Sequence, residues 1–258
     1  EKKSIGFLSC ALIIAMPVLF VSAETVHLEI KRVKDQAMYS GGRMPDNMLI
    51  RWTFPRNARI ITDDSQNDEF AEVVPKELTQ YQLEKPARGI VEFSGNKFGF
   101  VLDSTNFEDE GYNRLILDLN RNGDLTDDDA IEARPLPDNT MYGGGYIQRE
   151  FPRIDVTLEI DGKQHPYSFF PLVVCDTNLR ENSNMSSFQQ AYFTAGVYYE
   201  GEIELDGKTH RIVVTDFNTN GRFDDRFDSK KSTQGRLAGR GMSPAALLYG
   251  TNAPDLIL

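Results

Sequence analysis

Two short segments of the sequence carry the side chains best suited to hold an ion. Residues 118–129 read DLNRNGDLTDDD, and residues 216–225 read DFNTNGRFDD. Both begin with D-x-N-x-N-G, so side-chain oxygens stand at positions one, three and five, with glycine at position six. These alternate oxygens converge on one point as the chain curls, and the glycine permits the sharp bend. A carbonyl at position seven and a later carboxylate complete the shell. The spacing therefore predicts two cation sites.

The predicted ligands follow from these positions. In the first segment they are Asp118, Asn120, Asn122, the carbonyl of Asp124, and either Asp127 or Asp129 as the closing ligand. In the second segment they are Asp216, Asn218, Asn220, the carbonyl of Arg222, and Asp224, Asp225 or Asp228 as the closing ligand. Asp225 stands where Asp127 stands, which favours that pair as the shared closing ligand. A shell of hard oxygens, some of them neutral, suits Ca²⁺ better than Mg²⁺.

The two segments resemble the calcium-binding loops of EF-hand and dockerin proteins. Leu125 and Phe223 occupy the apolar position of that pattern, and Asp129 matches its closing position, where the second segment has Phe227. An EF-hand has a helix on each side of its loop, whereas both segments here follow strand-like runs. The resemblance therefore covers the loops only. It implies calcium ligation without the helical fold, as in exported β-proteins whose ion fixes a strand end.

A single D-x-N-x-N-G segment is also typical of a capped turn, because Asn and Asp side chains accept hydrogen bonds from nearby backbone and tolerate positive φ. Two copies, each followed by an apolar residue and then carboxylates, favour cation binding. Each loop has one certain carboxylate ligand, so we expect affinity on the order of 10⁻⁴–10⁻³ M, the range of extracellular modules. Sites this weak indicate a structural role rather than a sensor.

The charge balance narrows the choice of partners. The 258 residues include 28 Lys and Arg against 39 Asp and Glu, for a net charge of -11. Nucleic acids and anionic membrane surfaces repel such a protein, so neither is an expected partner. Calcium and an unidentified extracellular macromolecule are the expected partners.

The N-terminal residues are typical of a cleavable signal peptide. Lys2 and Lys3 precede an apolar run over residues 5–21, and small residues end the segment at residue 23. An uncleaved anchor is the alternative. We therefore expect a secreted, periplasmic or cell-surface protein with no membrane insertion after cleavage. The sequence lacks an initiator Met and stops in a strand-like run, which indicates a fragment.

Short runs rich in Val, Ile, Phe and Tyr predict a mostly β fold, arranged as an antiparallel sandwich or as two related β units with one to three short helices. Strands are expected at residues 26–33, 97–102, 114–119, 155–160, 167–174, 198–205 and 211–215. Helices are expected at residues 69–83, interrupted by Pro75, at residues 187–195, and after Ser243 and Pro244.

Two runs, at residues 158–165 and 203–210, each place Asp-Gly between strand-like segments. They predict tight hairpins that form either an internal repeat or neighbouring hairpins of one sheet. The glycine-rich stretch at residues 137–146 is the candidate linker between a β-rich unit at 24–140, with the first loop, and another at 141–258, with the second. A single domain over residues 24–258 is the alternative.

Common catalytic motifs such as HExxH, GxSxG and Walker A are absent from the sequence. Removal of residues 1–23 would leave Cys175 as the only cysteine, so no internal disulfide could stiffen the exported protein. Cys175 ends an apolar run, which favours core packing over a nucleophile served by His165 or His210.

The expected function is therefore calcium binding that rigidifies a secreted or cell-surface β module. An exported hydrolase acting on polysaccharide or peptide, with structural calcium, is the alternative. It would require a cleft of carboxylates, His and aromatic side chains.

Overall fold

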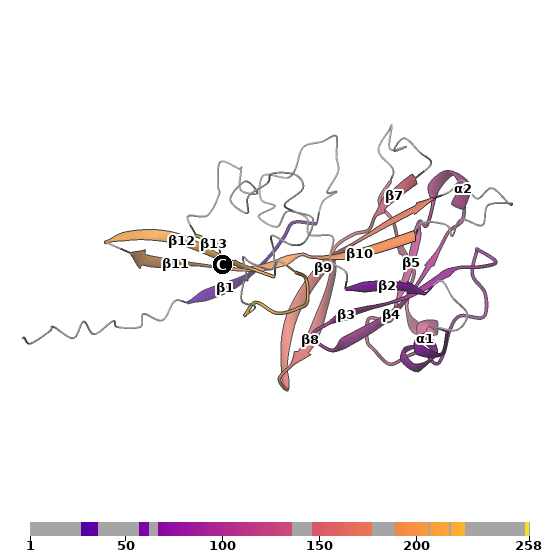
Figure 1. Cartoon of the computed structure of the whole chain (residues 1–258), viewed down its shortest axis with the longest axis horizontal. Helices are drawn as coiled ribbons and strands as arrows, with labels where there is room; N and C mark the ends of the chain where they lie inside the picture. Colours follow the sequence, from indigo (N-terminus) through magenta and orange to yellow (C-terminus); the bar gives the residue numbers. More distant parts are fainter. Residues whose placement is uncertain are drawn as a thin grey trace, which may run out of the picture.

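The structure, a computed structural model, describes residues 27–35, 57–61, 67–135, 146–176, 189–205, 207–216, 218–224 and 256–257. Three sheets account for most of these residues, and every strand pair but one is antiparallel (Figure 1). This arrangement confirms the predicted mostly β fold. The predicted signal peptide and the predicted linker lie largely outside the described residues, as does the helix expected after Ser243.

The first sheet has five strands in the order β2-β3-β4-β5-β6. They are β2 (Ala58–Ile61), β3 (Ala87–Phe93), β4 (Asn96–Asp103), β5 (Arg114–Leu117) and β6 (Ile131–Glu132). A two-residue turn joins β3 to β4, with φ of 48° at Ser94 and 81° at Gly95. Positive φ at both positions matches the twist of the flanking strands, so this turn is of the primed kind.

The second sheet is built around the long strand β9 (Lys163–Asp176). Its first half pairs with β8 (Ile154–Ile160), and its second half pairs with β7 (Tyr146–Glu150) and β10 (Gln189–Ala195). The third sheet has the order β1-β11-β12-β13, formed by β1 (Leu28–Arg32), β11 (Val197–Leu205), β12 (Lys208–Thr215) and β13 (Leu256–Ile257). Figure 1 shows the β11–β12 hairpin extending away from the other two sheets.

The two Asp-Gly hairpins form as predicted but belong to different sheets. The β8–β9 hairpin turns at Asp161 and Gly162, with φ of 51° and 73°, and the β11–β12 hairpin turns at Gly207. Gly196 separates them, because it joins β10 of the second sheet to β11 of the third. The expectation of neighbouring hairpins in one sheet is therefore wrong.

The main hydrophobic core lies between the first and second sheets, which form a sandwich. Phe93 on β3 stacks on Phe169 of β9 at 5.0 Å between ring centroids, and Phe100 on β4 meets Phe193 of β10 at 5.2 Å. This cluster takes residues from both sides of the predicted boundary at 140. The division into two units, and its single-domain alternative, stay predictions.

A smaller cluster covers the other face of the first sheet. Phe70 and Val74, on and just after the helix α1 (Asn67–Val73), pack with Ile116 of β5 and with Leu125. The helix predicted at residues 69–83 ends earlier than expected, at Val73. Pro75 cannot continue a helix and disfavours helical backbone at the residue before it.

The helix predicted at residues 187–195 is wrong, since residues 189–195 form β10. Ala191, Phe193 and Ala195 all join the main core, which is the period-two pattern of a strand, although Thr194 on the other face is buried as well. Two short helical segments had no sequence prediction, namely α2 (Phe107–Glu110) and the 3₁₀ turn η2 (Leu125–Asp127). No helix within the described ranges is long and apolar enough to cross a membrane.

Phe93→Ala should lower the free energy of unfolding by about 3–5 kcal/mol, because it opens a cavity in a fully buried aromatic cluster. Urea denaturation measures this change. Phe93→Leu should cost less, and Lys163→Ala, at an exposed position of β9, should stay close to wild type. A Phe93→Ala protein as stable as Lys163→Ala would contradict the assigned core.

Candidate metal centre

Residues 118–129, called loop 1 here, leave the first sheet at the end of β5. The Asp118 backbone N–H donates to the carbonyl of Gly99 on β4 at 3.0 Å, which continues the strand pairing into the loop. Leu125 is fully buried in the smaller hydrophobic cluster. The apolar position of the predicted pattern thus anchors the loop to the sheet.

The segment after α1 holds the middle of loop 1. The Lys76 N–H donates to the Gly123 carbonyl at 3.1 Å, and the Leu125 N–H donates to the Lys76 carbonyl at 2.9 Å. Gly123 has φ of 77°, and a Cβ there would lie 2.8 Å from Cδ of Pro75. A glycine is therefore needed here both for the bend and for the close approach.

Side chains at alternate positions organise the curl of loop 1. The Asp118 carboxylate is 1% exposed and accepts the N–H groups of Asn122 at 3.1 Å and Gly123 at 2.9 Å. Asn120 Oδ1 accepts the Asn122 N–H at 2.9 Å, and Asn122 Oδ1 accepts the Asp124 N–H at 2.8 Å. The three side-chain oxygens predicted as ligands therefore all turn inward onto the same short stretch of backbone.

The 3₁₀ turn η2 brings later carboxylates back toward this curl. Asp127 Oδ2 accepts from Nδ2 of Asn122 at 2.9 Å and from Nδ2 of Asn120 at 3.5 Å. The Asp128 carboxylate accepts the Leu119 N–H through Oδ1 at 3.4 Å. Its other oxygen, Oδ2, is buried and has no hydrogen-bond partner among the described residues. A buried acceptor of this kind is costly unless something satisfies it.

Burial raises the pKa of Asp128 to about 6 from its ordinary 3.8. The Leu119 hydrogen bond opposes this rise, whereas the carboxylates of Asp118, Asp127 and Asp124 add to it. Four carboxylates of loop 1 therefore interact with one another at this point, and none of the causes of the Asp128 shift is a basic side chain of the described residues. A cation placed there would lower the energy of all these groups together.

Two predicted ligands of loop 1 have other surroundings. The Asp124 side chain points to Lys76, at 2.5 Å, and caps η2 by accepting the Thr126 N–H at 2.9 Å. The Lys76 contact is the main reason that the pKa of Asp124 falls to about 2. Only its backbone carbonyl was predicted to bind the ion, so this placement is compatible with that role. Asp129, one of the two closing candidates, is exposed, as is the other candidate, Asp127.

Loop 2, the described residues 216 and 218–224, repeats the conformation of loop 1. The Asp216 carboxylate accepts the N–H groups of Asn220 at 3.1 Å and Gly221 at 2.7 Å, matching Asp118. Asn218 Oδ1 accepts the Asn220 N–H at 3.3 Å, and Asn220 Oδ1 accepts the Arg222 N–H at 2.8 Å. The shared sequence pattern therefore specifies one local structure at two places in the fold.

The residue before each pair of bonded amides shares one further feature. Arg121 in loop 1 and Thr219 in loop 2 have φ of 57° and 54°, and the glycines that follow, Gly123 and Gly221, have φ of 77° and 87°. Non-glycine residues with such positive φ are uncommon, so the matching values confirm that the two loops curl in the same way.

Loop 2 differs from loop 1 in the partners of its carboxylates. The Tyr167 hydroxyl on β9 donates to Asp216 Oδ2 at 2.7 Å. Burial raises the pKa of Asp216, while this hydroxyl and the neighbouring N–H groups oppose the rise. Asp224 accepts two hydrogen bonds from the Arg222 guanidinium, both at 2.9 Å. Asp225 and Asp228 lie outside the described residues.

The structure thus brings together Asp118, Asn120, Asn122 and Asp127 in loop 1, and Asp216, Asn218 and Asn220 in loop 2. Sequence reasoning missed Asp128 and Tyr167. Nothing in the run Asp127-Asp128-Asp129 shows which carboxylate faces the loop, because η2 decides that. Tyr167 is 49 residues from Asp216 in sequence, so only the tertiary fold connects them.

Comparison with models of protein families, with curated proteins and with solved structures finds no match. Among the described residues, no group of three or more His, Cys, Asp and Glu side chains is arranged to hold a metal ion. In each loop the side chains at the first, third and fifth positions, one buried Asp and two Asn, accept backbone N–H groups of the loop itself.

The stability of the metal-free protein should depend on pH through Asp128. Its folded-state pKa of about 6 lies above its ordinary 3.8, so its ionisation disfavours the folded state. This contribution to the free energy of unfolding is present below about pH 4 and is lost as the pH rises through 6. Urea denaturation in EDTA between these pH values should show a smaller loss for Asp128→Asn than for wild type. Parallel pH profiles for the two proteins would contradict the assignment.

Tyr167→Phe should lower the free energy of unfolding by about 1–3 kcal/mol, because it leaves the buried Asp216 carboxylate without one donor. Tyr81→Phe is the matched control, since the Tyr81 hydroxyl donates to the partly exposed Glu77 at 3.0 Å. Chemical denaturation compares the two variants. Equal losses of unfolding free energy in the two variants would show that the hydrogen bond to Asp216 contributes no more than the one to Glu77.

Proposed function

We propose that loop 1 binds Ca²⁺ and that the ion stabilises the end of β5 in an exported β module. The observation that carries the proposal is the buried, unpartnered Oδ2 of Asp128 beside the carboxylates of Asp118 and Asp127. Without a cation, the Asp118 carboxylate and one oxygen of Asp128 are buried next to the exposed carboxylate of Asp127. With one, the same oxygens become ligands.

The donor set favours calcium over other common ions. Asp118, Asn120 and Asn122 offer side-chain oxygens, the Asp124 carbonyl adds another, and Asp127 or Asp128 closes the shell. Each amide or carboxylate oxygen that accepts one backbone N–H retains a second lone pair for a cation. Hard oxygen ligands at irregular spacing suit the six to eight ligands of Ca²⁺, whereas Mg²⁺ demands a strict octahedron.

The position of loop 1 supports a structural role. The loop follows β5 of the first sheet, its backbone bonds to Lys76 in the segment after α1, and its Leu125 packs in the smaller core cluster. An ion there would tie these elements together. At calcium about ten times the dissociation constant, one such site would add about 1.4 kcal/mol to the free energy of unfolding.

Loop 2 is the weaker of the two predicted sites. Asp216 has its charge satisfied by backbone N–H groups and by Tyr167, and Asp224 is occupied by Arg222. These contacts stabilise the carboxylates of loop 2, as an ion would stabilise those of loop 1. We therefore propose that calcium stabilises loop 1 first and loop 2 only at higher concentration.

The cellular context rests on the sequence. An exported location follows from the predicted signal peptide, and a net charge of -11 suits a calcium-rich exterior. The rival function, a hydrolase, would need a catalytic cleft. Cys175 is fully buried, and burial raises the pKa of its thiol to about 11, so core packing is confirmed for this residue. His165 and His210 lie in hairpins of different sheets.

Calcium should raise the melting temperature of the protein by about 3–6 °C relative to EDTA, as expected for a gain of about 1.4 kcal/mol in a domain of this size. Differential scanning calorimetry measures the shift. The double variant Asp118→Asn with Asp128→Asn should lose most of it, because the charges of the two carboxylates that are buried in whole or in part are removed while side-chain size is kept.

The matched control is Asp216→Asn, which makes the equivalent change in loop 2. This variant should melt at a lower temperature overall but keep most of the calcium-dependent shift. Magnesium at the same concentration should give a smaller shift than calcium. Identical melting curves in calcium and EDTA would refute the proposal, and loss of the shift only in Asp216→Asn would assign the site to loop 2.

A further inference from the structure

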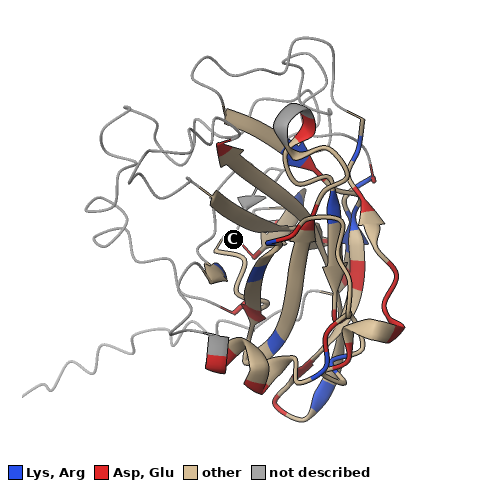
Figure 2. Cartoon of the chain, turned by 90° about the vertical axis from the view of Figure 1, so that its right-hand side faces the viewer, with Lys and Arg blue, Asp and Glu red and all other residues tan. Residues whose placement is uncertain are grey.

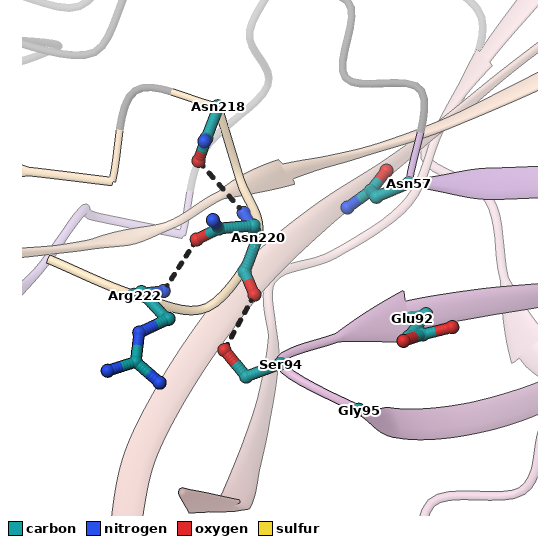
Figure 3. Close-up of a pocket in the computed structure, with 7 residues that line it drawn as sticks. All are labelled: Asn57, Glu92, Ser94, Gly95, Asn218, Asn220 and Arg222. Carbon is teal, nitrogen blue, oxygen red and sulfur yellow. Dashed lines mark hydrogen bonds between the residues drawn. The ribbon is translucent and has the colours of Figure 1, made fainter. Parts of the chain in front are cut away.

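An open pocket of about 540 Å³ lies between loop 2 and the edge of the sandwich. Figure 3 shows loop 2 on one side and, on the other, the start of β2 and the β3–β4 turn. The lining residues are all polar or glycine, namely Asn57, Glu92, Ser94, Gly95, Asn218, Asn220 and Arg222. Its volume falls within the usual range for small-molecule sites.

The walls of this pocket are held together by hydrogen bonds across three elements. Ser94 Oγ donates to the Asn220 carbonyl at 2.9 Å. Asn57 Nδ2 donates to the carbonyls of Thr219 at 3.0 Å and Phe193 at 3.1 Å. The pocket therefore keeps its shape without an ion in loop 2, and a ligand would not have to order the walls on binding.

The charges around the pocket disfavour an anionic ligand. The Arg222 guanidinium is bound by both oxygens of Asp224 and lies 3.5 Å from Asp161. Its positive charge is therefore already balanced. Glu92 is exposed on β3 and adds a negative charge at the opposite wall, with Lys97 facing it across the strand pair. Figure 2 shows acidic and basic residues interspersed over the described ribbon rather than gathered by sign.

The lining also disfavours an apolar ligand, because it presents amide, carboxylate, hydroxyl and guanidinium groups. Hydroxyl groups suit such a surface, since each can donate to a carboxylate or amide oxygen and accept from an amide or guanidinium N–H. From this chemistry we infer that the pocket binds a neutral, polyhydroxylated ligand, namely an uncharged oligosaccharide. The inference does not depend on calcium binding at loop 1.

Isothermal titration calorimetry tests the inference directly on the full chain, in EDTA and again in calcium. The probes are maltohexaose, cellohexaose, xylohexaose and laminarihexaose at about 10 mM, which would reveal millimolar affinity. At least one should bind, and Glu92→Ala and Arg222→Ala should each weaken it about tenfold, the effect of one or two lost hydrogen bonds to a charged group. Glu92→Gln keeps the shape of the side chain and separates the loss of charge from misfolding.

Glu202→Ala, at an exposed position of β11, is the matched control and should bind as wild type does. Trigalacturonate and a Gly-Ser hexapeptide serve as the acidic and peptide probes. The inference would be overturned if none of the four neutral sugars binds. It would also be overturned if binding is unchanged in both the Glu92 and the Arg222 variants. Preference for trigalacturonate or for the peptide would overturn it as well.

Discussion

The burial of one aspartate at the start of each loop is the constraint on which the rest of the account depends. Asp118 and Asp216 are each 1% exposed and follow directly after strands β5 and β12. A buried carboxylate needs several donors or a cation, because desolvation otherwise disfavours its charge. Each loop supplies the first donors by curling its own backbone N–H groups onto that carboxylate. The two loops differ in the additional groups that lie next to this carboxylate.

These additional groups differ because the two loops pack against different parts of the fold. Loop 2 packs on the sandwich core, where Gly221 lies close to Phe93 and Leu158 and where Tyr167 reaches Asp216. Loop 1 packs on the segment after α1 and contains η2, which brings carboxylates rather than a hydroxyl toward the curl. The same six-residue pattern is therefore completed by a tyrosine hydroxyl in loop 2 and by further carboxylates in loop 1.

Local chemistry was predictable from the sequence, whereas long-range contacts were not. The two curled loops and the Asp-Gly turns follow from residues that are close in sequence, and both are found. The helix predicted at residues 187–195 is replaced by strand β10 over residues 189–195, in which Ala191, Phe193 and Ala195 all face the main core. The separation of the hairpins into two sheets depends on Gly196, whose role appears only once both sheets are built. Asp128 and Tyr167 were missed for the same reason, since tertiary packing sets their orientation.

The most direct measurement is a crystal structure of the protein grown with calcium and again with terbium, whose anomalous signal identifies the ion. The account predicts a strong peak inside loop 1, at about 2.3–2.6 Å for calcium from oxygens of Asp118, Asn120 and Asn122. Asp127 or Asp128 should close the shell, and any peak in loop 2 should be weaker. A well-ordered loop 1 with no peak, or one with an ion bound only in loop 2, would contradict the central claim.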